Sequence, residues 1–166
     1  MPRSTNPTGF TVEEATERDV PLVLALIKEL AEYERLSHEV VATENGLRSA
    51  LFGSKPAAEF VIGRSNGEPV GFALYFHNFS TFVGRRGLYL EDLYVRPSER
   101  GRGFGRALMA HVARVARERG CERMEWAVLD WNEPAIEFYR RLGALPMSGW
   151  TVFRLTGNAL LGLAAP

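Results

Sequence analysis

A segment rich in glycine and arginine constrains this chain most strongly, running RGRGFGR from Arg100 to Arg106. Strand-forming residues precede it at Leu88 to Val95, and Pro97 ends that strand. An amphipathic pattern follows, so the segment is predicted to be a turn between a strand and the start of a helix. Such a turn aims unpaired backbone N–H groups at one point, where the helix dipole adds about half a positive charge. It therefore predicts a phosphate site, which the arginines, including Arg102, supplement with charge-assisted contacts.

Two common phosphate-binding motifs do not match this turn. It lacks the Lys-Ser/Thr pair of a P-loop, which argues against nucleotide hydrolysis. Gly101 and Gly103 fit the first two glycines of a dinucleotide fingerprint, but Arg106 occupies the position of the third. The predicted order of elements also lacks an opening βαβ unit. Neither class of ligand is therefore predicted.

Hydrophobic periodicity along the chain predicts a mixed α+β or α/β domain in the order β-α-α-β-β-β-α-β-α-β. Strands are expected at residues 10–14, 59–64, 70–77, 88–95, 124–129 and 151–155. Helices are expected from residue 20 to about 35, from Thr43 to Gly53, from the glycine turn to Gly120, and from Asn132 to Gly143.

Short signals mark the ends and faces of these elements. Thr16 and Asp19 predict a capping box ahead of the first helix, with Asp19 at its third position. The pair Asn66-Gly67 favours positive φ and predicts a hairpin between the second and third strands. The helix after the glycine turn is expected to bury Leu108, Val112 and Val115.

Length and composition are those of one soluble domain. The 166 residues are predicted to form a single domain, with residues 1–9 as a flexible tail and residues 158–166 as a second tail. The 20 basic and 20 acidic residues cancel, which argues against a nucleic-acid or membrane-surface partner. The chain contains no apolar stretch approaching the about 20 residues of a membrane helix, and no signal-peptide pattern.

Cysteine and histidine usage predicts neither a disulfide nor a metal site. The single cysteine, Cys121, excludes an intramolecular disulfide and suits a cytoplasmic location. It also has no evident histidine partner that would make it a nucleophile. The three histidines lack metal-ligand spacing and are expected on the surface or in packing: His38, His77 and His111.

The residues Arg100-x-x-Gly103-x-Gly105 resemble the (Gln/Arg)-x-x-Gly-x-(Gly/Ala) pattern of the GNAT acetyltransferases, whose turn cradles the pyrophosphate of CoA. The similarity is greater to one branch, the diamine (spermidine/spermine) and thialysine acetyltransferases. It rests on residues 27–34 (IKELAEYE), 88–93 (LYLEDL) and 131–134 (WNEP), and it extends over residues 10–155. The resemblance implies a GNAT fold with a mixed, mostly antiparallel sheet between helices, acetyl-CoA as co-substrate, no metal and a homodimer.

The resemblance also implies a set of cofactor-binding residues. Leu93 and Val95 resemble residues whose backbone pairs with the pantetheine arm, as an added strand would. Asn132 either binds the cofactor or caps its helix. The full set comprises Leu93, Tyr94, Val95, Arg100, Gly101, Arg102, Gly103, Phe104, Gly105, Arg106, Asn132, Pro134, Ala135 and Tyr139.

Acetyl transfer to an amine requires a base and an acid. An amine of pKa ~10.4 is neutral in only about one molecule in ~10³ near neutral pH, and the thiolate leaving group profits from a proton. Tyr139 matches the position of the family's acid tyrosine; without that match it would be an aromatic core residue. Glu91 is the candidate base, with Asp92 as partner for a cationic amine, and strand alternation is expected to place these carboxylates on opposite sides. The alternative has one carboxylate exposed and the other bonded to backbone.

The acceptor is expected to be a small cationic amine: a diamine, a polyamine or a lysine-like amino acid. Polyamine enzymes of the branch carry an acidic residue and a Trp in the loop before the strand that contains LYLED (residues 88–92), where this chain has Ser80 to Arg86 (STFVGRR). Added arginines weaken binding of a long polycation, which favours a smaller amine over spermine. The substrate-binding residues expected from the resemblance are Tyr33, Glu34, Glu91, Asp92, Glu125, Trp126 and Ala127.

Two other functions remain open from the sequence. One is acetylation of a protein lysine or N-terminus, and the other is an acyl-CoA-binding module without turnover. The presence of Tyr139 and Glu91 argues against the second.

Overall fold

A five-stranded sheet in the order β1-β2-β3-β4-β5 forms the centre of one of the two compact units of the chain. We call Met1–Ala127 the sheet unit and Val128–Pro166 the C-terminal unit. The structure is a computed structural model that describes residues 7–165. Its strands are β1 (Phe10–Glu14), β2 (Glu59–Ser65), β3 (Glu68–Ser80), β4 (Arg85–Val95) and β5 (Met124–Glu125). The first four pair antiparallel and β5 pairs parallel to β4, so the predicted mixed fold is confirmed.

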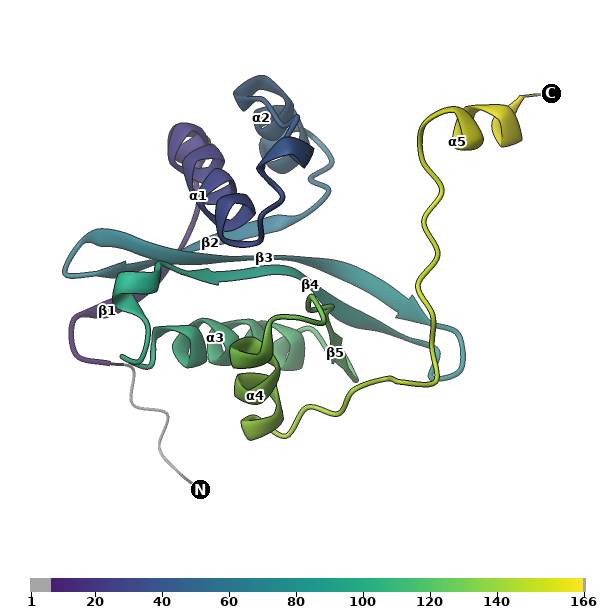
Figure 1. Cartoon of the computed structure of the whole chain (residues 1–166). Helices are drawn as coiled ribbons and strands as arrows, with labels where there is room; N and C mark the ends of the chain where they lie inside the picture. Colours follow the sequence, from purple (N-terminus) through teal and green to yellow (C-terminus); the bar gives the residue numbers. More distant parts are fainter. Residues whose placement is uncertain (1–6, 166) are drawn as a thin grey trace. The chain divides into compact units, whose positions relative to one another are not determined.

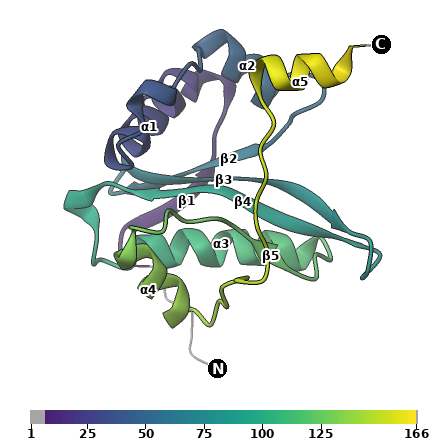
Figure 2. The same ribbon diagram turned by 45° about the vertical axis from the view of Figure 1, so that its right-hand side comes forward.

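Helices cover both faces of this sheet. Helices α1 (Val20–Tyr33) and α2 (Glu44–Phe52) lie on one face, and α3 (Phe104–Glu118) lies on the other (Figures 1 and 2). On the first face, Val23 and Leu26 of α1 join Phe72 and Tyr94 of the sheet in a buried cluster. On the second face, the ring of Phe10 stacks on that of Phe104 with centroids 4.5 Å apart. The same sheet therefore holds α1 and the start of α3 on opposite sides.

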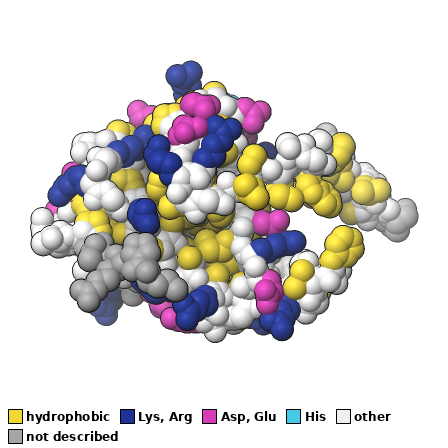
Figure 3. Space-filling view, turned by 90° about the horizontal axis from the view of Figure 1, so that it is seen from below, with side chains coloured by type: hydrophobic (Ala, Val, Ile, Leu, Met, Phe, Trp, Pro, Cys, Tyr) yellow, Lys and Arg dark blue, Asp and Glu magenta, His cyan; other side chains and the backbone are white. Residues whose placement is uncertain are grey.

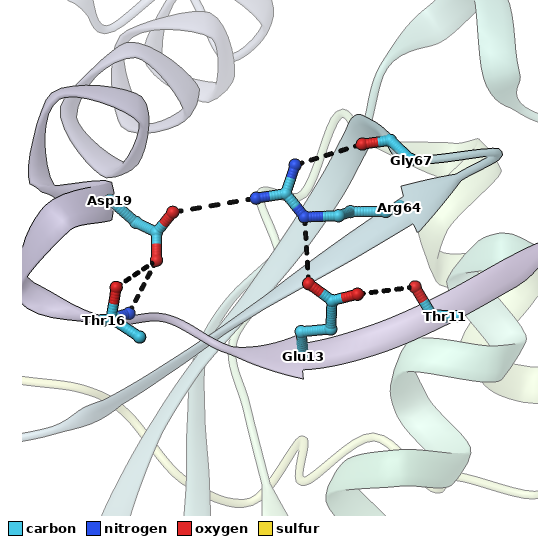
Figure 4. A network of polar contacts seen from close by, with 6 residues as sticks. All are labelled: Thr11, Glu13, Thr16, Asp19, Arg64 and Gly67. Atoms are coloured by element: carbon cyan, nitrogen blue, oxygen red, sulfur yellow. Dashed lines mark hydrogen bonds and ion pairs between the residues drawn. The ribbon is translucent and has the colours of Figure 1, made fainter.

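A network of polar contacts fixes the entry into α1 (Figure 4). The predicted capping box is confirmed, since the Asp19 carboxylate accepts hydrogen bonds from the backbone N–H and the hydroxyl of Thr16, each at 2.8 Å. This box caps a short 3₁₀ turn, η1 (Glu17–Asp19), that leads into α1. Arg64 of β2 donates to Glu13 at 3.1 Å and to the carbonyl of Gly67 at 3.2 Å, and it pairs with Asp19 at 3.7 Å. The start of the helix is thereby tied to two strands.

The hairpins β2–β3 and β3–β4 bear on two predictions made from the sequence. The predicted Asn66-Gly67 turn is confirmed, with φ of 50° and 88° at the two residues. In the β3–β4 ladder, Leu74 pairs with Asp92 and Tyr75 pairs with Leu90. Glu91 is therefore an extra residue, a β-bulge in β4, and the expected alternation of faces does not continue across it.

The predicted helix ends are mostly confirmed. Thr43 caps α2, its side chain accepting from the N–H of Gly46 at 3.1 Å. Helix α3 buries Leu108 and Val112, whereas Val115 is only half-buried and Ala116 is buried in its place. The short 3₁₀ turns η2 (Ser37–Glu39) and η3 (Pro97–Glu99) follow α1 and β4.

Of the two strands predicted near the C-terminus, one is shorter than expected and the other was wrong. The strand expected at 124–129 is β5, which covers only Met124 and Glu125, and residues 151–155 form no strand. Alternating apolar residues favour a strand only where a neighbouring strand pairs with their backbone, and no described strand pairs with this segment. Phe153 in it is 92% exposed. The C-terminal unit contains α4 (Glu133–Arg141) and α5 (Gly157–Ala164), and all but the first residue of α5 lie in the tail expected at 158–166. Most of the tail expected at 1–9 lies outside the described residues.

Charged side chains of both signs are interspersed over the surface seen in Figure 3, in keeping with the zero net charge of the chain. Within residues 7–165, every helix is too short or too polar to cross a bilayer.

Candidate active site

The glycine turn presents the N-terminus of α3, a helix of 15 residues. Gly101 and Gly103 have φ of 77° and 83°, in the left-handed region that glycine adopts without strain. Gly103 is the N-cap, and because glycine has no side chain to bond the first N–H groups of the helix, these remain available. The side chain of Phe104 is buried on Phe10, so only its backbone can contact a ligand. The turn has the features that suit an anion.

The three arginines of the turn are held differently. Arg106 is exposed on the first turn of α3. Arg102 pairs with Glu99, and its guanidinium lies 4.8 Å from the centroid of the Phe104 ring. Arg100 donates through Nε to the carbonyl of Val95 at 2.9 Å, and its guanidinium lies over the ring of Tyr33 in α1. Arg100 therefore joins the turn to two other elements as well as adding charge.

Beyond its first residues, β4 has one edge without a described strand partner. The parallel ladder with β5 covers only Leu88 and Tyr89 of β4, opposite Met124 and Glu125. From Glu91 to Val95, the only strand among residues 7–165 that pairs with β4 is β3. An extended ligand can bond to such an edge as an added strand would, and the edge leads to the glycine turn.

Carboxylates gather where β4 faces the end of α1. Asp92 is half-buried and pairs with Leu74, which packs on the same cluster as α1. Burial, and then the charges of Glu91 and Glu34, raise the pKa of Asp92 from 3.8 to about 7. Burial also raises the pKa of Glu34, which caps the C-terminus of α1. The two neighbouring charges disfavour ionisation of Asp92, so a cation beside it would stabilise its carboxylate form.

The end of β4 and α1 are also linked by an ion pair that the sequence did not suggest. Arg96 donates through Nε and a terminal nitrogen to the two carboxylate oxygens of Glu29, at 2.9 and 2.8 Å. It also donates to the carbonyl of Pro69 at 2.6 Å. Neither residue belonged to a predicted site. The one sequence signal for a role of Glu29 was its position four residues before Tyr33, a predicted substrate-binding residue, because this spacing places both on the same face of a helix.

The remaining residues of the expected sites lie as follows. Glu125 opposes Tyr89 in the ladder and accepts from Asn78 at 3.1 Å. It also pairs with Arg123 at 3.1 Å. Trp126 is half-buried and Ala127 is exposed at the end of the sheet unit.

The C-terminal unit carries the other expected cofactor residues on α4. Asn132 is 7% exposed and accepts from the N–H of Ala135 at 3.4 Å, so its predicted role as an N-cap is confirmed. Pro134 lies in the first turn of α4, as expected. Tyr139 is half-buried, with its ring centroid 5.3 Å from that of Phe138.

The part of the chain that the structure describes contains no group of three or more His, Cys, Asp or Glu residues that could hold a metal ion.

Several known proteins are similar to this chain in sequence. Thialysine N-epsilon-acetyltransferase from Bos taurus is 42% identical over 164 residues, which cover 92% of this chain and 96% of that protein. L-ornithine N5-acetyltransferase NATA1 from Arabidopsis thaliana is 34% identical over 205 residues, covering 94% and 90%. Spermidine/spermine N(1)-acetyltransferase-like protein 1 from Homo sapiens is 33% identical over 98% of this chain, which spans 25% of that protein.

Solved structures and a family model agree with these similarities. An integron cassette protein from the mobile metagenome of V. cholerae superposes with a TM-score of 0.80 at 25% identity, over 96% of this chain and 99% of that one. The model of the Acetyltransferase (GNAT) family matches residues 23–144, which include the glycine turn, β4 and α4. The chain therefore belongs to the GNAT family and is an acetyl-CoA-dependent acetyltransferase.

Proposed function

We propose that this enzyme acetylates a terminal amine of a small acceptor that carries a second positive charge, either a short diamine or a lysine-like amino acid. The observation that carries the proposal is the group of carboxylates at the junction of α1 and β4. Burial and two neighbouring carboxylates raise the pKa of Asp92 to about 7. A bound ammonium group would offset both effects and stabilise the ionised Asp92 carboxylate. A neutral acceptor would leave this repulsion uncompensated.

The names of the relatives support the same class of acceptor. Thialysine and ornithine are amino acids with a second amine on the side chain, and the proteins named for them are 42% and 34% identical to this chain. Spermidine and spermine are longer polycations. At the start of β4 in this chain, Arg85 and Arg86 stand where an acidic residue would favour such polycations, so we rank spermidine and spermine as weaker acceptors.

On the cofactor side, we assign the pyrophosphate of acetyl-CoA to the glycine turn. The left-handed Gly101 and Gly103, the start of α3 and the exposed Arg106 suit that group. The pantetheine arm would extend along the free edge of β4 and bond to the backbone at Leu93 and Val95. From the sequence resemblance, we propose that Asn132, Pro134 and Ala135 of α4 also bind the cofactor.

The proposed chemistry is direct transfer. Glu91 removes a proton from the acceptor ammonium, directly or through water, and the amine nitrogen attacks the thioester carbonyl. The carbon–sulfur bond then breaks, and Tyr139 gives its proton to the leaving thiolate. The second proton, which the attacking nitrogen loses as the amide forms, returns the Tyr139 phenolate to its neutral form. The bulge at Glu91 supports this role because bulges re-aim a side chain out of the regular ladder. On resemblance we also propose that the enzyme is a homodimer, and the single cysteine supports a cytoplasmic location.

The deciding experiment is release of free CoA thiol from acetyl-CoA with ornithine, lysine, thialysine, putrescine, spermidine, spermine and short lysine peptides. We expect the highest kcat/KM for a dicationic amino acid or short diamine. A maximum with spermine would contradict the choice of a small acceptor, and a maximum with peptides would indicate protein acetylation instead.

Replacing Tyr139 by Phe separates an enzyme from a binding module without turnover. Loss of a general acid is expected to lower kcat about 10²-fold or more, with the acetyl-CoA dissociation constant nearly unchanged. Phe138→Leu is the neighbouring control, since it alters the same ring contact without removing a hydroxyl. Equal losses in both variants would mean that Tyr139 acts through packing.

A further inference from the structure

Arg100 of the glycine turn stacks on an aromatic ring of α1. Its guanidinium carbon lies 4.1 Å from the centroid of the Tyr33 ring, and its Nε donates to the carbonyl of Val95 at 2.9 Å. The Tyr33 side chain is half-buried and packs against the cluster that joins α1 to the sheet. The ring thus lies between the interior and the turn. The stacking contact therefore joins the glycine turn to the last turn of α1.

A second contact fixes the same helix face one turn earlier. Glu29 accepts two hydrogen bonds from Arg96, the residue that follows β4. Glu29 and Tyr33 are four residues apart and lie one above the other on α1. With α1 anchored at Glu29 by an ion pair, the stacking contact at Tyr33 sets how its C-terminal end lies against β4.

That end of α1 carries an acceptor carboxylate. Glu34 follows Tyr33 directly and is close enough to Asp92 to act on its ionisation. The separation of these two carboxylates determines how well they enclose a cation. Tyr33 therefore links a residue of the cofactor turn to the geometry of the acceptor site.

We propose that Tyr33 is a positioning residue, which couples acetyl-CoA binding to acceptor binding through its stacking with Arg100. This inference rests on the proposed function, because it takes the turn as the pyrophosphate site and Glu34 with Asp92 as the acceptor site. A pyrophosphate in the turn fixes Arg100, which holds Tyr33 and with it Glu34. By reciprocity, an acceptor at Glu34 and Asp92 raises the affinity of the turn for acetyl-CoA by the same factor.

The test is a double-mutant cycle of Tyr33→Leu and Arg100→Gln, read as separate KM values for acetyl-CoA and for the best acceptor of the panel. A cation–π contact of this kind corresponds to about a twofold to fivefold change in an equilibrium constant. Tyr33→Leu is expected to raise the acceptor KM by that factor with little change in kcat. In the Arg100→Gln background the same replacement should have no further effect. Tyr33→Phe, which keeps the ring, should restore the wild-type acceptor KM.

Arg102→Gln is the matched control within the turn. Its described contacts are with Glu99 and Phe104, so it should raise the KM for acetyl-CoA and leave the acceptor KM unchanged. The proposal is wrong if the effects of Tyr33→Leu and Arg100→Gln on the acceptor KM multiply as independent changes. It is also wrong if Arg102→Gln raises the acceptor KM as much as Arg100→Gln does.

A binding measurement keeps this inference separate from the proposed function. If the wild-type enzyme acetylates no amine of the panel, the proposed function fails, but acetyl-CoA binding can still be measured by calorimetry. The coupling then predicts that Tyr33→Leu weakens acetyl-CoA binding about twofold only while Arg100 is present. Equal weakening in both backgrounds would overturn it, and thermal unfolding of each variant would show whether the protein is folded.

Discussion

The segment of β4 from Glu91 to Val95 has a site for a different charge at each of its two ends. After Val95 the glycine turn offers backbone N–H groups, a helix dipole and arginines, all of which suit an anion. At the bulge, Glu91 and Asp92 lie near Glu34 and suit a cation. The first region consists of consecutive residues, whereas the second forms only when α1 packs on the sheet. A short segment can thus form an anion-binding turn by itself, while the proposed acceptor site depends on tertiary packing.

The largest expected effect tests the cation end. Asp92→Asn removes one charge without changing the shape of the side chain. Losing a charged hydrogen-bond partner corresponds to about 1.5–3 kcal/mol, so kcat/KM for a dicationic acceptor should fall about 10- to 100-fold. The dissociation constant of acetyl-CoA, measured by calorimetry, should hardly change. A parallel loss of acetyl-CoA affinity would contradict the division of β4 into two regions.

The next effect tests the anion end with two matched glycines. Gly101 and Gly120 have φ of 77° and 69°, and a Cβ added at either would meet no atom within 4 Å. An alanine in this region costs about 1–2 kcal/mol at both positions. Gly101→Ala should therefore weaken acetyl-CoA binding about 5- to 30-fold, whereas Gly120→Ala should lower thermal stability alone. Equal acetyl-CoA affinities in the two variants would remove the turn from the cofactor site.

A smaller effect concerns Glu34, which is more distant from the reacting strand. Glu34→Gln relieves some of the repulsion that raises the pKa of Asp92 and weakens the hold on the second ammonium group. The acceptor KM for dicationic amines should rise several-fold, by about the 0.5–1 kcal/mol of a partly exposed charge pair. Monoamines of equal length serve as the comparison substrates, and their KM should not change.

The smallest effect is on stability and needs no ligand. The folded state raises the pKa of Asp92 to about 7, so folding favours its protonated form. That contribution is complete below pH 3.8 and is lost as pH rises through about 7. Between pH 6 and pH 8 the melting temperature of the wild type should fall relative to that of Asp92→Asn, by about 2–4 °C if the group contributes about 1 kcal/mol. Parallel pH profiles would show that Asp92 is ionised throughout.

The same comparison shows what the sequence can predict. The turn, the helix caps at Thr16, Thr43 and Asn132 and the Asn66-Gly67 hairpin were predicted because each depends on neighbouring residues. The bulge at Glu91 left no such signal, because no glycine or proline marks it and the residues around it read as a regular strand.

Predictions failed where structure depends on distant partners. The segment 151–155 has the composition of a strand, yet no described strand pairs with it. The contacts of Arg96 with Glu29 and of Arg100 with Tyr33 join residues 67 positions apart, and no local pattern predicts such contacts. The chemical character of the site was therefore more predictable than the arrangement of its supporting contacts.

The crowding of carboxylates at the bulge also has a calorimetric consequence. With a pKa of about 7, the Asp92 carboxyl is partly protonated at neutral pH, and an acceptor cation that binds beside it would expel that proton into the buffer. The observed heat of acceptor binding would then vary with the ionisation enthalpy of the buffer chosen. The affinity for the acceptor would also tighten as the solution is made mildly alkaline. Proton release would thus accompany recognition of the second charge, before any acetyl group moves.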